Sequence, residues 1–444
     1  MEKSPRTLEK SITKDKSHLY DVESLSTVKS NSNIGNLSNK SQLEIPQDGG
    51  WFAWTQAGLC ALIMLNTWGL IFSYGVFQDY YRHTLLPNNN PSSISWIGSL
   101  QVFLLFFLGA FSGNLLDMGF VRSLFLSGSI LIVLGLLMTS FASSYWQLFF
   151  SQGICIGIGN GLLFCPSLSV VTTYFTSKRS IAMGICASGS AIGGIIFPAL
   201  FSNLLPVIGF SWTIRAAALI EFICLSVCAI GLKSRVPPKK SGGLFDFESL
   251  KDTSYVLFAW GMFFNLWGDY FAVHYITLYA STVLGLSTKD SMNVLMVLNG
   301  VGLIGRIAPN ILADFYAGSL NVLIIVCVSS GVMSFCWISV SNRAGLYSWA
   351  VFYGIVSAAV QSLYPAALSN LTKDISKSGT RMGMVLTFIS FTALTGAPIA
   401  GELIERQGGK YMYAQIFSGL SLIVGSGFLI GSRMVESRKF AFKI

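Results

Sequence analysis

Residues 233–252 read KSRVPPKKSGGLFDFESLKD, and this stretch divides the chain into two parts. It combines proline, glycine and charged residues, which is typical of a linker. Both flanking parts are apolar: 52% of the whole chain is hydrophobic and 11% is charged. A typical soluble protein carries about 25% charged residues. The composition therefore excludes most soluble globular, disordered and nucleic-acid-binding proteins and favours a chain that folds in a lipid bilayer.

Apolar segments long enough to cross a bilayer as helices occur on both sides of this linker, since a crossing needs about 20 residues. We predict that the first part crosses at 52–78, 93–116, 122–141, 146–172, 179–202 and 211–232. In the second part the predicted crossings are 253–280, 289–313, 320–340, 346–370, 381–403 and 411–432. The predicted fold is an all-α membrane protein with twelve transmembrane helices in two six-helix bundles.

The domain organisation follows from these segments. The two bundles are predicted at 49–232 and 253–433, joined by the cytoplasmic linker 233–252. Residues 1–48 are rich in Ser, Thr and charged residues and are predicted to be a disordered cytoplasmic tail. Residues 434–444 are predicted to be a second cytoplasmic tail.

Lysine and arginine residues indicate how the chain is oriented. With the N-terminus in the cytoplasm, 22 of the 29 Lys and Arg residues fall on the cytoplasmic side and six on the other, while Arg306 lies within a membrane span. Cytoplasmic loops of membrane proteins are enriched in positive residues. Both termini are therefore predicted to be cytoplasmic, and the net charge of +9 is attributed to orientation rather than to nucleic-acid binding.

The two halves repeat each other in their polar residues. Asp117 ends the second predicted helix, and Asp314 ends the eighth. Pro198 and Pro398 lie late in the fifth and eleventh helices. This repetition indicates an internal duplication, and two parallel repeats of six helices are the architecture of major facilitator transporters.

Three motifs carry a resemblance to a known family. Residues 113–122, GNLLDMGFVR, resemble the loop signature between helices two and three of the major facilitator superfamily. Residues 48–51, DGGW, and 174–184, YFTSKRSIAMG, with 187–190, ASGS, look like the two signatures of the monocarboxylate transporter family, in the form found in its fungal branch.

The resemblance implies movement of a small organic molecule by facilitated or proton-coupled transport, with two bundles rocking around a central site. It implies gating roles for four residues near the cytoplasmic surface: Asp117, Arg122, Lys178 and Arg179. That family includes monocarboxylate carriers and a riboflavin carrier. The implied location is the plasma membrane, although no sequence address excludes the endoplasmic reticulum or the vacuole.

Arg306 is the foremost candidate for solute binding, because ionisable residues inside a membrane are costly and commonly functional. The family has an arginine here that faces the substrate path, and a guanidinium can hold a carboxylate through two hydrogen bonds. The structural alternative is a pairing with Asp269 on the seventh helix. In animal members an Asp precedes this arginine by four residues, where this chain has Gly302, and residues 69–74 lack their lysine. These departures weaken the expectation of lactate transport and of simple proton symport.

Weaker candidates for solute contact come from three helices: Asp269, Trp267, Tyr270, His274 and Asn299, with Gln361 as a further hydrogen-bonding side chain. His274 titrates near physiological pH and could respond to protons. Aromatic residues on helices one, seven, ten and eleven suit a flat solute through stacking, or else pack against lipid and one another.

Enzymatic activity is not expected, because the chain has no phosphate-binding Gly-rich loop, no metal-ligand cluster and no room for a catalytic domain. The prediction therefore includes no cofactor and no metal; its partners are a small solute, possibly a proton, and the lipid bilayer, with the oligomeric state open. A non-transporting nutrient receptor that signals through its tails is the alternative outside the transporter class.

Overall fold

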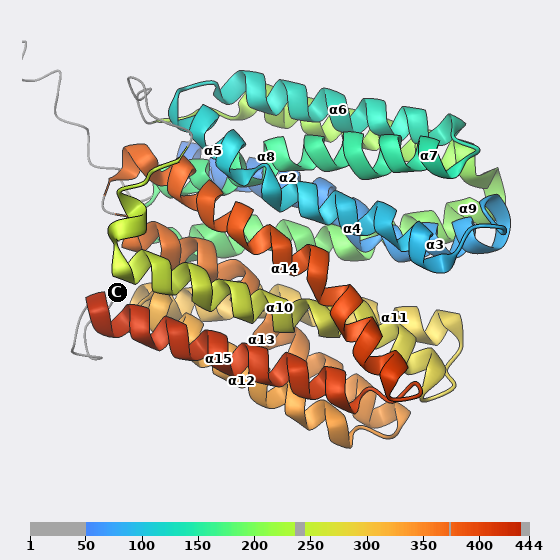
Figure 1. The fold of residues 1–444 in the computed structure, drawn as a ribbon. Coiled ribbons are helices and arrows are strands. Elements are labelled where there is room, and N and C mark those ends of the chain that lie inside the picture. Colours follow the sequence, from blue (N-terminus) through green and yellow to red (C-terminus); the bar gives the residue numbers. More distant parts are fainter. Residues whose placement is uncertain (1–49, 236–244, 373, 437–444) are drawn as a thin grey trace, which may run out of the picture. The chain divides into compact units, whose positions relative to one another are not determined.

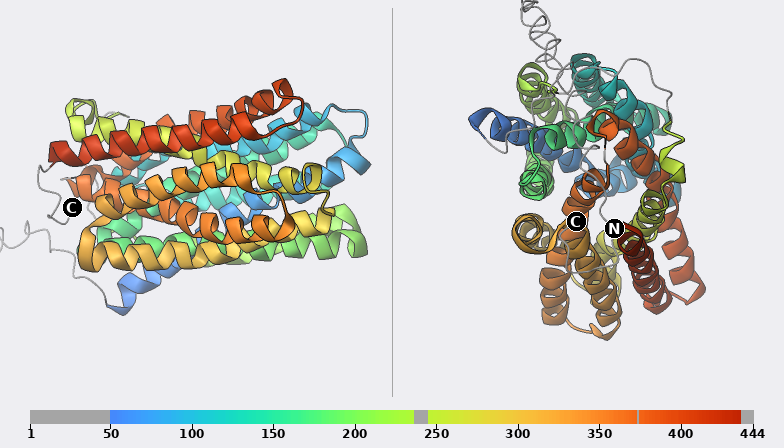
Figure 2. Two further views of the ribbon diagram at one scale, coloured as in Figure 1. Left: turned by 90° about the horizontal axis from the view of Figure 1, so that it is seen from below. Right: turned by 90° about the vertical axis from the view of Figure 1, so that its left-hand side faces the viewer.

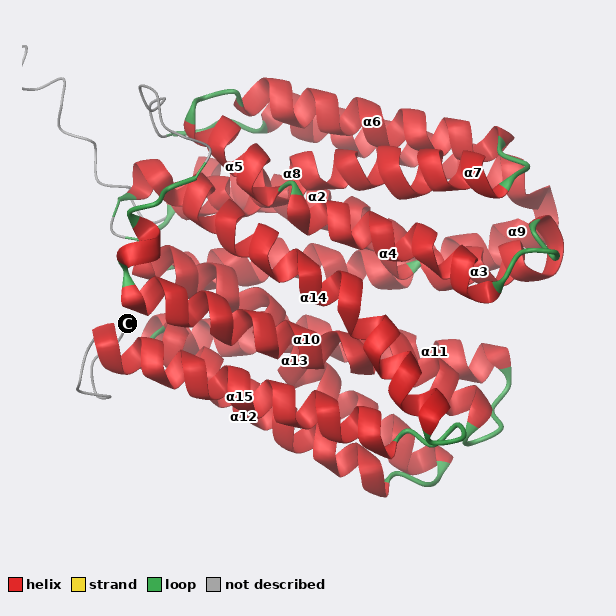
Figure 3. Ribbon diagram, viewed as in Figure 1, coloured by secondary structure: helices red, strands yellow, loops and turns green. Residues whose placement is uncertain are grey.

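The computed structural model describes residues 50–235, 245–372 and 374–436, and within these ranges the elements are helices joined by short loops (Figure 3). The described residues belong to one compact unit, Pro46–Ile444. The predicted tail 1–48, residues 236–244 of the linker and residues 437–444 lie outside the described ranges.

The first half runs from α2 to α9. Its helices are α2 (Trp51–Phe72), α3 (Tyr74–Tyr80), α4 (Pro91–Phe107), α5 (Gly109–Asp117), α6 (Val121–Phe141), α7 (Tyr145–Leu148), α8 (Gly157–Tyr174) and α9 (Arg179–Gly231). Two π-helical segments continue α3 and α7, at Tyr81–Leu85 and Phe149–Ile156. Several predicted single helices therefore consist of two or three consecutive pieces.

The second half runs from α10 to α15. Its helices are α10 (Thr253–Thr282), α11 (Thr288–Leu312), α12 (Ser319–Cys336), α13 (Arg343–Leu371), α14 (Ser378–Arg406) and α15 (Met412–Glu436). A π-helical turn, Ala313–Ala317, follows α11, and 3-10 turns lie at Ser249–Lys251, Trp337–Ser339 and Ile375–Lys377. The first of these turns precedes α10 directly.

Helix α9 accounts for two membrane crossings. Its 53 residues would extend about 80 Å as one straight helix, whereas an apolar bilayer core is about 30 Å thick. The backbone leaves the helical conformation at Gly209, whose φ is 75°, so the chain reverses there. The described residues hold eleven helical stretches that are long and apolar enough to span a membrane, and with α9 crossing twice the number is twelve. The predicted twelve crossings are confirmed.

Glycines allow the helices of the first half to approach closely. A Cβ at Gly189 or Gly193 of α9 would collide with the backbone of α2 at Ala61 or Leu65. Small residues permit such close contact between helices in a membrane, where van der Waals packing replaces the hydrophobic effect.

The two halves meet along α5 with α14 and along α9 with α11 (Figures 1 and 2). Gly113 of α5 faces Gly379 of α14, and Gly109 faces Gly383, so that a Cβ at any of the four would strike the opposite backbone. These contacts lie toward the end of the bundle from which the linker leaves, which we call the linker end. At the opposite end, α3 and the end of α14 diverge in Figure 1.

Candidate functional site

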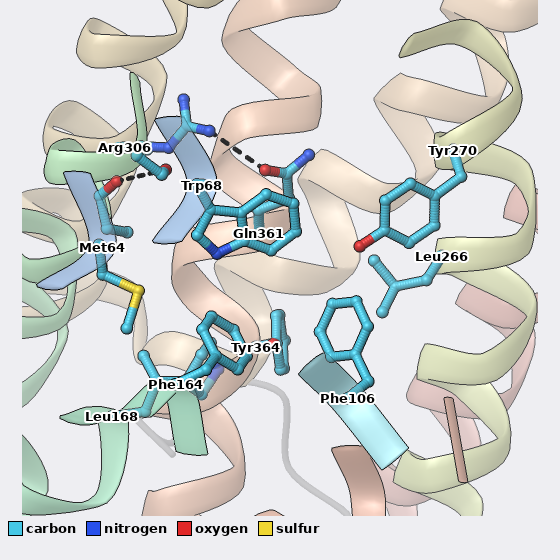
Figure 4. Close-up of a pocket in the computed structure, with 13 residues that line it drawn as sticks. Met64, Trp68, Phe106, Phe164, Leu168, Leu266, Tyr270, Arg306, Gln361 and Tyr364 are labelled. Atoms are coloured by element: carbon cyan, nitrogen blue, oxygen red, sulfur yellow. Dashed lines mark hydrogen bonds between the residues drawn. The ribbon is translucent and has the colours of Figure 1, made fainter. Parts of the chain in front are cut away.

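A cavity lies between the two halves near the middle of the helices. Side chains from seven helices line it: Met64, Trp68, Phe106, Phe164, Leu168, Ala187, Ser190, Leu266, Tyr270, Arg306, Gln361, Tyr364 and Pro365 (Figure 4). The cavity volume is about 30 Å³, enough for one or two water molecules. A larger solute therefore requires the helices around the cavity to move apart.

Aromatic rings form one wall of this cavity. The ring of Trp68 is centred 6.0 Å from that of Phe106 and 5.9 Å from that of Phe164, with edge-to-face orientation in both pairs. Phe106 also contacts Phe164 at 5.5 Å and Tyr270 of the second half at 6.3 Å. The wall thus spans both halves and offers ring edges and faces to a flat apolar group.

Arg306 is the one charged side chain among the described residues that line the cavity, and it lies above the aromatic rings in Figure 4. It is 3% exposed. Its Nη2 donates to Oε1 of Gln361 at 3.1 Å, while its Nε has no hydrogen-bond partner in the described structure. A buried donor without a partner is costly, so this nitrogen can bind an acceptor supplied by a solute.

Gly302, one turn before Arg306, explains how the guanidinium fits. A Cβ at Gly302 would lie 2.7 Å from Nη1 of Arg306 and 3.2 Å from Cβ of Ala358. The guanidinium of Arg306 therefore lies next to the space that a side chain at position 302 would enter. The missing side chain at 302 makes room for the cation.

Asp269 lies behind Gln361 and does not line the cavity. It is fully buried, and its two oxygens accept hydrogen bonds from the Tyr353 hydroxyl and from Nε2 of Gln361, both at 3.1 Å. In the described structure Asp269 and Arg306 form no direct ion pair, because the Gln361 amide lies between the two charges. The geometry is therefore compatible with both predictions for Arg306, solute contact and structural pairing: the side chain faces the cavity, and it is linked to Asp269 through Gln361.

The other candidates for solute contact are placed differently. Tyr270 lines the cavity, as expected of a contact residue. Trp267 does not: its ring packs against Phe263 at 5.6 Å and Phe417 at 5.1 Å. The reason is helical geometry: Trp267 lies three residues before Tyr270 on α10, so the two side chains point about 60° apart around the helix.

His274 and Asn299 do not line the cavity. His274 is exposed one turn beyond Tyr270, and its Nδ1 lies 2.8 Å from the Tyr270 carbonyl oxygen. Asn299 lies two turns before Arg306 on α11, is 3% exposed, and packs against Gly194 of α9. Both residues are on the side of the cavity opposite to the linker end.

At the linker end, two aspartates hold helix N-termini of the opposite half. Asp117 accepts hydrogen bonds from the backbone N–H groups of Gly379 (3.0 Å) and Thr380 (2.7 Å), the second and third residues of α14. Asp314 accepts from the N–H groups of Ser180 (3.0 Å) and Ile181 (2.7 Å), the second and third residues of α9. Free N–H groups and the helix dipole make such positions favourable for a carboxylate.

The basic gating candidates separate into two groups. Arg179 is buried, and its Nη1 donates to the carbonyl oxygen of Ser369 at 3.1 Å and to Oδ1 of Asn370 at 2.9 Å, both on the other half. Lys178 and Arg122 are exposed, and neither side chain makes a hydrogen bond or ion pair with another described residue. No contact in the described structure therefore supports the expected gating roles of Lys178 and Arg122.

Sequence reasoning assigned no specific site role to several residues of the site. Phe106 and Phe164 gave no signal, because aromatic residues make up 13% of the chain. Gln361 was expected only as a general hydrogen-bonding group, although it is the bridge between Arg306 and Asp269. The role of Asp314 could have been found from its repetition of Asp117 in the second half.

Comparison with known proteins points to one family. The model of the Major Facilitator Superfamily matches residues 57–373. An MFS-type transporter of Gibberella zeae is 44% identical over 400 residues, which cover 89% of each chain. An aspyridones efflux protein of Emericella nidulans is 34% identical, with 88% of this chain and 79% of the relative covered.

A solved structure agrees on the fold. The crystal structure of the human organic anion transporter MFSD10 (TETRAN) matches with a TM-score of 0.68 at 13% identity, covering 88% of this chain and 100% of that chain. At this identity the likeness concerns the fold alone.

Proposed function

Because the chain belongs to the Major Facilitator Superfamily and is a secondary transporter, not an enzyme, we propose that it exports an organic anion with a flat apolar body. The observation that carries this proposal is the guanidinium of Arg306, with an unpartnered Nε, above a wall of aromatic rings. An acidic group would bind Arg306 and the apolar body would lie against Trp68 and Phe106.

The outward direction rests on relatives. One similar protein is an aspyridones efflux protein, and others are agnestins and fujikurins efflux proteins. These names describe those proteins, and they support export as the direction proposed here. The two six-helix halves would rock about the cavity, with the contacts of Asp117 and Asp314 holding the linker end shut in one state.

We also propose that the chain lies in the monocarboxylate-transporter-like branch of the superfamily and in the plasma membrane. The support is the DGGW and YFTSKRSIAMG motifs. Gly50 precedes α2 with a φ of 88°, a conformation that suits glycine. Trp51, the first residue of α2, is 87% exposed, and tryptophan is enriched where helices leave a membrane.

Export from proteoliposomes tests the proposed function. The probe is 1-naphthalenesulfonate, a flat anion that stays ionised, loaded inside vesicles that contain the purified protein. We expect Arg306→Gln to slow its release at least about tenfold, because a charge-assisted hydrogen bond is lost. Arg343→Gln is the matched control, since Arg343 is exposed and pairs with Asp290 near the opposite end of α11, far from the cavity. Equal rates for wild type and Arg306→Gln would refute the proposal.

A neutral flat solute of the riboflavin type is the second candidate, favoured by the aromatic wall alone. The neutral isostere 1-naphthalenesulfonamide distinguishes the two. If the sulfonamide is exported as fast as the sulfonate, the wall and not Arg306 selects the solute.

A further inference from the structure

Gln361 holds two opposite charges apart in the middle of the second half. Its amide oxygen accepts from Nη2 of Arg306 on α11, and its amide nitrogen donates to Oδ2 of Asp269 on α10, each at 3.1 Å. Only this orientation of the amide satisfies both partners. If the amide were turned over, its N–H groups would face the guanidinium and its oxygen would face the carboxylate.

Among the described residues, Arg306 is the one full positive charge in the surroundings of Asp269. Tyr353 on α13 donates to Oδ1, Cys327 on α12 is within electrostatic reach, and Tyr270 is its neighbour on α10. Arg306 supplies the balancing charge through Gln361. Without a solute, the charges of Asp269 and Arg306 therefore cancel. The buried carboxylate is balanced by an arginine that it reaches only through Gln361.

We infer that Gln361 and Asp269 couple solute binding to a proton: when an anion occupies Arg306, Gln361 leaves the guanidinium and Asp269 takes up one proton. This inference rests on the proposed function. A bound anion adds a second negative charge to a buried site that has one positive charge, and an uncompensated buried charge is costly. One proton restores neutrality.

The proton has a definite source and destination. It comes from water on the side to which the cavity opens, and it binds Oδ2 of Asp269. The carboxyl O–H then donates to the amide oxygen of Gln361, which is free to turn once it no longer accepts from Arg306. No oxidant, reductant or other reactant is needed. The anion and the proton then cross together, so that a cell can export an acid along its own concentration gradient without moving net charge.

Linkage gives the sign of the pH effect. Because anion binding favours proton binding, proton binding must favour anion binding to the same degree. Affinity for the anion therefore rises as the pH falls, by up to about tenfold for each pH unit, over the range in which the empty site holds an ionised Asp269.

Calorimetry on the purified full chain tests the inference. 1-Naphthalenesulfonate is titrated in two buffers that differ in enthalpy of ionisation, and the difference in heat gives the number of protons taken up. The sulfonate stays ionised, so that any proton taken up is bound by the protein. We expect about one proton per bound anion for the wild type at neutral pH.

Two variants and one control make the result specific. Asp269→Asn is expected to bind the sulfonate without proton uptake and with an affinity independent of pH. Gln361→Met, which keeps the length of the side chain without the amide, is expected to lose at least half of the proton uptake. Glu221→Gln is the control, because Glu221 is a fully buried acid of the first half that is not part of this network; it should keep the wild-type value.

The outcomes separate this inference from the proposed function. Binding of the sulfonate to the wild type without proton uptake overturns the inference and leaves the proposed function standing. Proton uptake that persists in Asp269→Asn, or that disappears in Glu221→Gln, also overturns it. No binding of the sulfonate to the wild type rejects both.

Discussion

At the scale of single residues, the absence of a side chain at 302 matters as much as the arginine one turn later. The guanidinium of Arg306 occupies space that a Cβ at Gly302 would enter, at 2.7 Å from Nη1. The glycine at this position is thus part of the way in which the cation is placed. The sequence shows a glycine at position 302, but only the packing of α11 against α13 shows that a Cβ there would meet Arg306 and Ala358.

This geometry predicts a loss of affinity for Gly302→Ala. The added methyl group pushes the guanidinium from its position, and binding of 1-naphthalenesulfonate should weaken about threefold to tenfold, as for the partial loss of a hydrogen bond to a charged group. Titration of the purified variant measures the effect. Gly300→Ala is the matched control, because its Cβ would meet only Ile195 Cδ1, at an ordinary 3.8 Å. Similar losses in both variants would contradict the account.

The aromatic wall gives a second prediction at this scale. Trp68→Leu should weaken binding of 1-naphthalenesulfonate about twofold to tenfold, since an aromatic contact contributes roughly 0.5–1.5 kcal/mol beyond burial. Methanesulfonate, which has no ring, should bind both proteins alike. Trp267→Leu is the comparison, because Trp267 packs against Phe263 and Phe417 outside the cavity. A greater loss in Trp267→Leu than in Trp68→Leu would place the solute elsewhere.

At the scale of elements, two helix N-termini at the linker end each donate two backbone N–H groups to an aspartate of the opposite half. Asp117 binds the second and third N–H groups of α14, and Asp314 binds those of α9. The repetition of an aspartate at the end of the second and eighth helices predicted that the two residues are related. It did not predict that each holds a helix of the other half, because that depends on how the halves dock.

The similar caps predict effects in the same direction for Asp117→Ala and Asp314→Ala, with the larger effect at Asp117, which also accepts from Oγ1 of Thr380 at 2.7 Å. Loss of a carboxylate cap costs about 0.5–2 kcal/mol, so that the linker end should open more often in both variants. Hydrogen–deuterium exchange at residues 379–383 and 180–184 should rise about twofold to thirtyfold. Asp290→Ala, on a partly exposed residue at the other end of α11, serves as control. Unchanged exchange in either gate variant would show that its cap does not hold the halves together.

The predicted spans agree with the observed helices because long apolar runs leave few alternatives in a bilayer. The interruptions were not visible in the pattern. The breaks at Ser73 and Leu108 divide single predicted helices, and the turn between the fifth and sixth crossings is confined to Gly209 within one helical stretch. Such local changes depend on packing rather than on hydrophobicity.

At the scale of the whole molecule, the number of crossings and the division into two halves followed from the sequence, whereas the site did not. Gln361 bridges Arg306 and Asp269, which precede it in the chain by 55 and 92 positions. The cavity likewise combines Phe106 and Phe164 of one half with Tyr270 and Arg306 of the other. The hydrophobic pattern of a single helix does not predict which helix faces of the two bundles come into contact.

The orientation remains a prediction, and it is directly testable. The bias of 22 Lys and Arg residues to six places the loop around Gly408 and Gly409 outside. An Asn-Ser-Thr sequon with flexible flanks inserted there should be glycosylated, while the native sequons at Asn36, Asn39 and Asn370 should stay unmodified. A glycosidase-dependent mobility shift measures the result. A shift of the unmodified chain, or none with the insertion, would reverse the proposed orientation.

The central claim is that Arg306 recognises an acidic group on a flat solute. Its most direct test is titration of the purified protein with 1-naphthalenesulfonate and with the neutral 1-naphthalenesulfonamide. The account predicts that the wild type binds the sulfonate at least about tenfold more tightly, and that Arg306→Gln loses this preference while still binding the ring. Equal affinity of the wild type for both compounds, or an unchanged preference in Arg306→Gln, would contradict the account.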